Sequence, residues 1–101
     1  MEQPSIRSYR IRGTRITGPQ QSALDKYWGK YGIDYSLTPI NPTQLFPDSK
    51  QVILEIGFGM GEATAQIALT LPGTNFLCCE VHEPGVGALL KRIGEHNIPN
   101  I

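Results

Sequence analysis

Apolar residues recur at helical spacing in the first third of the chain. From residue 24 to residue 31 they stand three and four positions apart, and so lie on one face of a predicted helix: Leu24, Tyr27, Trp28 and Tyr31. Pro19 suits the first turn of this helix, and Gly32 suits its end. Residues 5–18 show no such stripe and predict an extended or irregular arm, while the proline-rich residues 33–49 predict a linker.

The rest of the chain alternates short apolar runs with helical stripes. Residues 52–56 form a run typical of a strand that is buried on both faces of a parallel sheet. A helix is expected next, with one face formed by Ala63, Ile67 and Leu71 beside Thr64 and Ala68. Residues 76–81 predict a second strand. A second helix then begins at Pro84, with apolar residues at helical spacing: Val86, Leu89, Leu90 and Ile93.

The order strand, helix, strand, helix predicts the α/β class. Strands joined by right-handed crossovers run parallel and carry both helices on the same face of the sheet. We expect a truncated Rossmann-like domain (β-α-β-α) in residues 51–101, preceded in residues 1–50 by a basic arm, a short helix and a linker. A third strand is expected to start near residues 98–101, so we expect an incomplete, marginally stable domain with one bare sheet face.

Composition excludes a membrane-spanning chain and gives no sign of a metal site. Hydrophobic residues make up 40% and charged residues 18%, and no apolar run approaches the ~20 residues that cross a bilayer. The N-terminus lacks the apolar stretch of a secretory signal, so we expect a cytoplasmic protein. Cys78 and Cys79 are adjacent, a spacing that suits neither a disulfide framework nor a zinc site.

The net charge of zero hides an uneven distribution. Residues 1–30 hold six basic and two acidic residues, whereas residues 31–101 hold three basic and seven acidic ones. Four of the six basic residues in residues 1–30 are arginines of the arm, which it offers for phosphate contact: Arg7, Arg10, Arg12 and Arg15. Such a cluster fits an RNA-binding segment, and by itself it also fits a solvated tail.

Three glycines follow the first predicted strand at alternate positions: Gly57, Gly59 and Gly61. Glycine lets the backbone turn tightly and approach a ligand ahead of a helix N-terminus. The dinucleotide fingerprint Gly-x-Gly-x-x-Gly would require a third glycine at position 62, where Glu62 stands. A carboxylate there would repel a pyrophosphate, so an NAD-binding oxidoreductase fragment is the disfavoured alternative. Glu62 also suits the first turn of a helix, where it complements the dipole.

Carboxylates around the turn favour a cationic ligand. Glu55 precedes the glycines, and Glu80 follows 25 residues later at the end of the second strand, close to the ~20-residue spacing at which a carboxylate reaches a ribose diol. The order acidic-x-Gly-x-Gly-x-Gly resembles the first motif of Rossmann-like methyltransferases that use S-adenosyl-L-methionine. That cofactor carries sulfonium and ammonium groups, which carboxylates attract. We therefore predict cofactor contacts from the three glycines and from Glu55, Glu80 and His82.

A closer resemblance extends over most of the chain. Glu55 to Gly61, the stretch Glu80-Val81-His82-Glu83-Pro84-Gly85-Val86-Gly87, and the segments at residues 12–17 and 23–28 are similar to bacterial tRNA (guanine-N7)-methyltransferases. The resemblance implies a tRNA substrate and formation of N7-methylguanine. By resemblance, Glu55 and Glu80 match the two early acidic cofactor positions of the family. Two later aspartates of the family, one of them in a catalytic Asp-Pro-Trp segment, fall beyond Ile101, so no catalytic residue is expected here.

Two interpretations of the chain stay open beside the disfavoured oxidoreductase. In the first, the chain is the N-terminal part of the enzyme, supplies half of the cofactor site and is inactive alone. In the second, it is a non-enzymic remnant that still binds tRNA through its arm.

Overall fold

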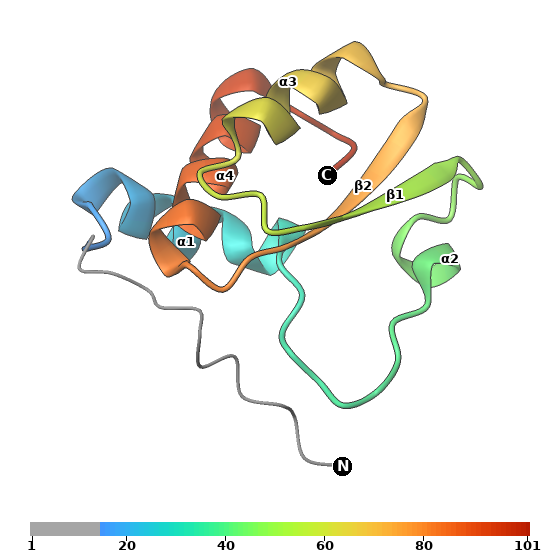
Figure 1. Ribbon diagram of the computed structural model, residues 1–101, viewed down its shortest axis with the longest axis horizontal. Coiled ribbons are helices and arrows are strands. Elements are labelled where there is room, and N and C mark those ends of the chain that lie inside the picture. The colour runs from blue at the N-terminus through green and yellow to red at the C-terminus, as the bar shows by residue number, and fades with distance from the viewer. Residues whose placement is uncertain (1–14) are drawn as a thin grey trace.

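The computed structural model describes residues 15–101 of the chain. The predicted arm lies almost entirely outside the described residues. In chain order the elements are α1 (Gly18–Tyr31), α2 (Pro42–Leu45), β1 (Gln51–Ile56), α3 (Glu62–Thr70), β2 (Thr74–Cys79) and α4 (Glu83–His96). Figure 1 shows α1 alongside α4, and α3 between α4 and the strand pair.

The two strands form a parallel sheet, as predicted. The register runs from Gln51 opposite Thr74 to Ile56 opposite Cys79, and α3 makes the crossover between the strands. The second strand begins two residues earlier than expected. On the other edge of β2, the Phe76 N–H donates to the carbonyl oxygen of Asn100 at 2.7 Å. The backbone therefore returns beside β2 in the region where a third strand was predicted.

The prediction that β1 is buried on both faces is wrong for this chain. Leu54 is 57% exposed and Ile56 is 77% exposed. Residues alternate between sheet faces, and the core contains Phe76 and Cys78 of β2, which face the helices. Leu54 and Ile56 lie on the opposite face, which neither α3 nor α4 covers. The bare sheet face expected from the sequence is thus present in the described chain.

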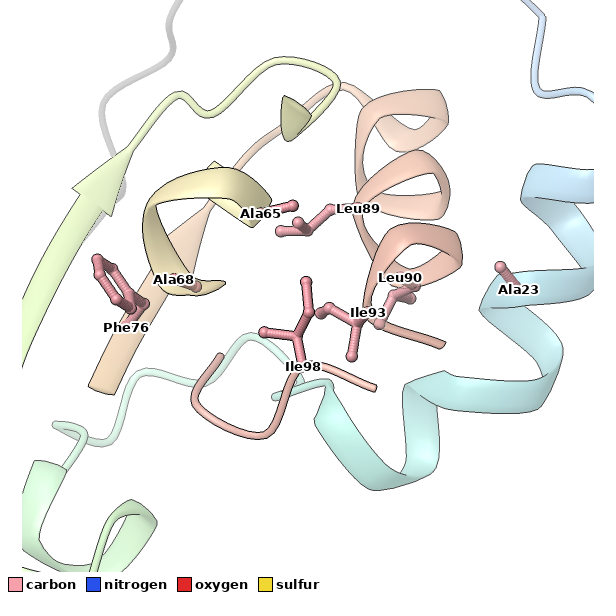
Figure 2. Close-up of a cluster of buried hydrophobic side chains, with 8 residues drawn as sticks. All are labelled: Ala23, Ala65, Ala68, Phe76, Leu89, Leu90, Ile93 and Ile98. Carbon is pink, nitrogen blue, oxygen red and sulfur yellow. The ribbon is translucent and has the colours of Figure 1, made fainter. Parts of the chain in front are cut away.

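The core lies between the sheet and the helices α1, α3 and α4. Figure 2 shows its buried side chains, which come from four elements and from the segment after α4: Ala23, Ala65, Ala68, Phe76, Leu89, Leu90, Ile93 and Ile98. The two residues that α3 contributes to this cluster are both alanines, Ala65 and Ala68. The predicted stripe of α4 is confirmed, because Leu89, Leu90 and Ile93 are buried and Val86 packs against them.

The predicted face of α3 is confirmed at Thr64 and Ala68 and wrong at Ala63, Ile67 and Leu71, so the buried face is turned by about one residue from its expected centre. Ile67 and Leu71 are 46% and 44% exposed, whereas Thr64, Ala65 and Ala68 are buried. One residue is about 100° of helix rotation, at 3.6 residues per turn. Sequence spacing alone favours the larger side chains as the core face. The buried stripe instead consists of smaller side chains, and α3 contacts both β2 and α4.

Asn100 fastens the C-terminal end of α3. Its side-chain Nδ2 donates to the carbonyl oxygens of Ala68 at 3.0 Å, Leu71 at 3.1 Å and Thr74 at 2.8 Å. The last carbonyls of a helix have no partner within that helix. A side chain distant in sequence therefore satisfies the end of α3 and joins it to the start of β2.

The first helix ends where the sequence predicts. Thr17 and Gln20 form a capping box at its start, Pro19 lies in its first turn, and Gly32 caps its end. The aromatic stripe predicted on this helix is confirmed, since its residues pack against the core: Leu24, Tyr27, Trp28 and Tyr31. The short helix α2, within the predicted linker, was not expected. Asn41 caps it, and Pro42 occupies its first turn.

Close contact between α1 and α4 depends on glycine. A Cβ at Gly87 would lie 2.7 Å from the carbonyl oxygen of Gln20, and one at Gly94 would collide with the ring of Tyr27. Real Cβ atoms do not approach backbone atoms that closely. Without side chains at these two positions, the helices lie near enough for the aromatic stripe of α1 to cover α4. Among residues 15–101, no helix is long and apolar enough to cross a membrane.

We expect Gly87→Val to destabilise the fold. The added side chain would push α1 away from α4, and overpacking of this kind costs ~1–3 kcal/mol. Gly29→Val is the matched control, because it places the same side chain in a helix where nothing lies within 4 Å. Urea unfolding followed by circular dichroism measures both free energies of unfolding. Equal values for the two variants would contradict the close packing of α1 on α4.

Candidate cofactor site at the glycine turn

The turn between β1 and α3 has a backbone that only glycine adopts easily. Gly57, Gly59 and Gly61 have φ angles of 81°, 65° and 78°, in the left-handed region. The three glycines have different surroundings. A Cβ at Gly61 would lie 2.7 Å from Leu89, whereas nothing lies within 4 Å of a Cβ at Gly57 or Gly59. Gly61 therefore serves packing against α4, and the other two leave the outer side of the turn open.

Glu80 connects this turn to the end of β2. One carboxylate oxygen accepts from the Gly59 N–H at 2.6 Å, and the other accepts from the N–H groups of Val81 at 2.9 Å and His82 at 3.1 Å. Carboxylates that accept backbone N–H groups make charge-assisted, strong hydrogen bonds. The carboxylate predicted from sequence spacing thus lies directly against the glycine turn.

Gly85 makes that contact possible, and sequence reasoning did not identify it. It lies in the first turn of α4, and a Cβ there would collide with the carbonyl oxygen of Gly59. The start of α4 can therefore approach the turn only with glycine at this position. The sequence signal for this contact was the Pro84-Gly85 pair. Glycine has a low helix propensity, so its presence in the first turn of a helix indicates a role other than helix formation.

Glu55 lies on the helix-facing side of β1 and is half-buried. One of its carboxylate oxygens accepts from the Thr64 hydroxyl at 2.5 Å. Its partner in the strand register is Cys78. Burial raises the pKa of the Cys78 thiol to about 12, with smaller contributions from the negative charges of Glu55 and Cys79. The charge of Glu55 therefore acts on Cys78 at the helix-facing side of the sheet.

His82 and two further glutamates surround the same region. His82 is the N-cap residue of α4, is partly buried, and makes no capping hydrogen bond with its side chain. Glu62 and Glu83 are exposed in the first turns of α3 and α4, where acidic residues complement the helix dipoles. Together with Glu55 and Glu80 they surround the turn with carboxylates. Such a surface attracts a cationic ligand.

The candidate RNA-binding residues are separate from this turn in sequence. Arg7, Arg10 and Arg12 lie outside the described residues, and Arg15 is exposed just before α1. Within residues 15–101, no group of three or more His, Cys, Asp or Glu side chains is placed to hold a metal ion.

The chain has a parallel strand, a glycine turn, a helix and a second strand followed by a carboxylate. This order is compatible with the first half of a Rossmann-like fold. Residues 49–101 match the model of a family described as putative methyltransferase. The chain belongs to this family.

Curated relatives confirm the resemblance predicted from the motifs. Over 97 residues the chain is 53% identical to the tRNA (guanine-N(7)-)-methyltransferase of Neisseria meningitidis serogroup C, covering 96% of this chain and 41% of the relative. It is 56% identical over 96 residues to the protein of that name from Acidovorax sp. (95% of this chain, 38% of the relative). With that of Saccharophagus degradans it shares 47% identity over 97 residues (96% and 42%). The chain thus spans about two fifths of the length of these relatives.

We expect iodoacetamide to alkylate Cys79 well before Cys78 in the folded chain. Cys79 is exposed, while the raised pKa of Cys78 leaves little of the reactive thiolate at mildly alkaline pH. Labelling of Cys78 should accelerate as the pH rises toward 12 and when urea unfolds the chain. Peptide mass spectrometry over time measures both rates. Glu55→Gln should speed labelling of Cys78, and equal rates for the two cysteines would contradict the burial described here.

Proposed function

We propose that this chain forms the methionine-side and ribose-side contacts of the S-adenosyl-L-methionine site of a tRNA (guanine-N7)-methyltransferase. The observation that carries the proposal is the open glycine turn held between two carboxylates, Glu55 and Glu80. Membership of a methyltransferase family supports it, and so do the printed names of the relatives. The same family membership counts against the NAD-binding alternative.

The residues around the turn fit this cofactor chemically. When bound, S-adenosyl-L-methionine supplies an electrophilic methyl group on a positively charged sulfur. Gly57 and Gly59 leave room for a ligand against the turn. In this proposal Glu55 binds the ammonium group of the methionine part, and Glu80 accepts from the ribose hydroxyls. The N–H groups of Val81 and His82 hold the Glu80 carboxylate in place beforehand, which reduces the ordering that binding requires.

In the proposed reaction, the main task of the protein is to position guanine N7 against the methyl group. Guanine N7 carries a lone pair and attacks without prior loss of a proton, so no general base is needed. Holding nucleophile and methyl group in line is worth up to ~7–11 kcal/mol of the barrier. We assign no catalytic residue within this chain, and His82 is proposed only to shape the pocket beside Glu80.

The proposed substrate is tRNA, gripped in part by the basic arm. Arg7, Arg10, Arg12 and Arg15 would contact phosphates, and a tRNA substrate goes with a cytoplasmic location. The same arm serves the second interpretation, a non-enzymic tRNA-binding remnant. The two interpretations differ at the glycine turn, because only an N-terminal part of the enzyme requires cofactor binding there.

Substitution of Glu80 should weaken cofactor binding. We expect Glu80→Ala to raise the Kd for S-adenosylhomocysteine about tenfold or more, since a hydrogen bond to a charged group is worth ~1.5–3 kcal/mol. Glu95→Ala is the matched control, because it removes an exposed carboxylate near the other end of α4. Nuclear magnetic resonance titration reaches the millimolar affinities of a partial site. Wild-type binding by Glu80→Ala would contradict the ribose role, and tRNA binding without cofactor binding would favour the remnant.

Removal of the arm's positive charge should weaken binding to tRNA and reduce its salt dependence. Each lost phosphate contact lowers the slope of log affinity against log salt by ~0.7–0.9. The test is a gel shift over a salt series with the four arm arginines changed to alanine. A control variant removes the same number of charges elsewhere, at Lys26, Lys30, Lys50 and Lys91. Unchanged affinity and slope in the arm variant would exclude the arm as the tRNA contact.

A further inference from the structure

Thr64 makes a contact that its place in the helix does not explain. It lies in the first turn of α3, is 2% exposed, and donates its hydroxyl to Glu55 at 2.5 Å. A helical threonine hydroxyl commonly bonds to the carbonyl three or four residues back. Here the fourth carbonyl back belongs to Met60, which accepts from Arg92 Nε at 3.4 Å. The hydroxyl of Thr64 is directed at the strand instead.

The surroundings of Thr64 favour a purely apolar residue. Its buried neighbours on α3 are Ala65 and Ala68, which pack against Leu89 and Phe76. Threonine also has a lower helix propensity than alanine. A hydroxyl in this position is unfavourable unless it has a partner. Its partner is a carboxylate of the candidate site, so the bond links the core face of α3 to the cofactor side of β1.

We infer that Thr64 is a positioning residue for the cofactor site, which fixes the Glu55 carboxylate for the ammonium group of the methionine part. This inference rests on the proposed function and extends it by one residue. The bond restrains one oxygen of Glu55 and limits the rotamers of a side chain that has several. A carboxylate oriented beforehand binds a cation with less loss of conformational freedom. Thr64 itself does not touch the ligand in this assignment.

The test compares two ligands on the 101-residue chain. S-adenosylhomocysteine carries the amino-acid group that Glu55 would meet, and methylthioadenosine lacks it. Thr64→Val keeps the branched shape and removes only the hydroxyl. We expect Thr64→Val to raise the Kd for S-adenosylhomocysteine about tenfold, the value of one hydrogen bond to a charged group. Binding of methylthioadenosine should stay at the wild-type level, and Thr64→Ser should restore the first ligand.

Two further measurements keep the inference falsifiable. In a Glu55→Gln background, Thr64→Val should add no further loss, because the two residues act together. If Thr64→Val fails to fold by circular dichroism, Glu55→Asp replaces it, since the shorter side chain keeps the charge and draws the carboxylate away from the hydroxyl. We then expect the same ligand-selective loss.

Each outcome decides a specific point. Wild-type affinity of Thr64→Val, or of Glu55→Asp in its place, for S-adenosylhomocysteine would overturn the inference and leave the proposed function intact. Equal weakening of both ligands would also overturn it, because it indicates a structural effect on the whole site. If the wild-type chain binds neither ligand at millimolar concentration, the proposed function fails for this chain, and the role of Thr64 fails with it.

Discussion

The hydrogen bond between the Gly59 N–H and the Glu80 carboxylate joins the two halves of the described β-α-β-α unit. It connects the turn after β1 with the end of β2, at the edge where parallel strands deliver their carboxyl ends. The other oxygen of Glu80 holds the backbone that leads into α4. Together with the packing of Gly61 against Leu89, this side chain and the glycine at position 85 help to set the position of α4 relative to the turn, and so the shape of the candidate site.

Local sequence signals predicted the helices and strands well, but they did not always predict which face of each is buried. Proline and glycine at the two ends of α1 marked its bounds, and the strand–helix alternation gave the parallel pair. The core face of α3 was predicted only in part, because two neighbouring stripes satisfy the same helical period, and the buried one consists of Thr64, Ala65 and Ala68. The helix α2 was missed because four residues with one asparagine cap leave almost no periodic signal.

The candidate site, too, could be predicted from the sequence only in part. Glycines at alternate positions, and an acidic residue at the end of each strand, were visible as spacing, and their geometry follows from the strand ends. The roles of Gly85 and Thr64 were not visible, although Gly85 belongs to the stretch that resembles the family and Thr64 belongs to the predicted face of α3. Gly85 matters through a close approach between backbones, and Thr64 through a hydroxyl aimed across to β1. Both effects arise only when segments distant in sequence come together.

The hydrogen bonds from the Asn100 side chain to the end of α3 have a consequence for the order in which the structure forms during synthesis. The amide of Asn100 donates to carbonyl groups of residues 68, 71 and 74, so these three hydrogen bonds at the end of α3 can form only once residue 100 is present. On a ribosome, which releases the chain from its N-terminus, the glycine turn would emerge some forty residues before the side chain that secures the helix behind it. The hydrogen bonds from Asn100 to the end of α3 therefore form only after the residues of the glycine turn have been synthesised.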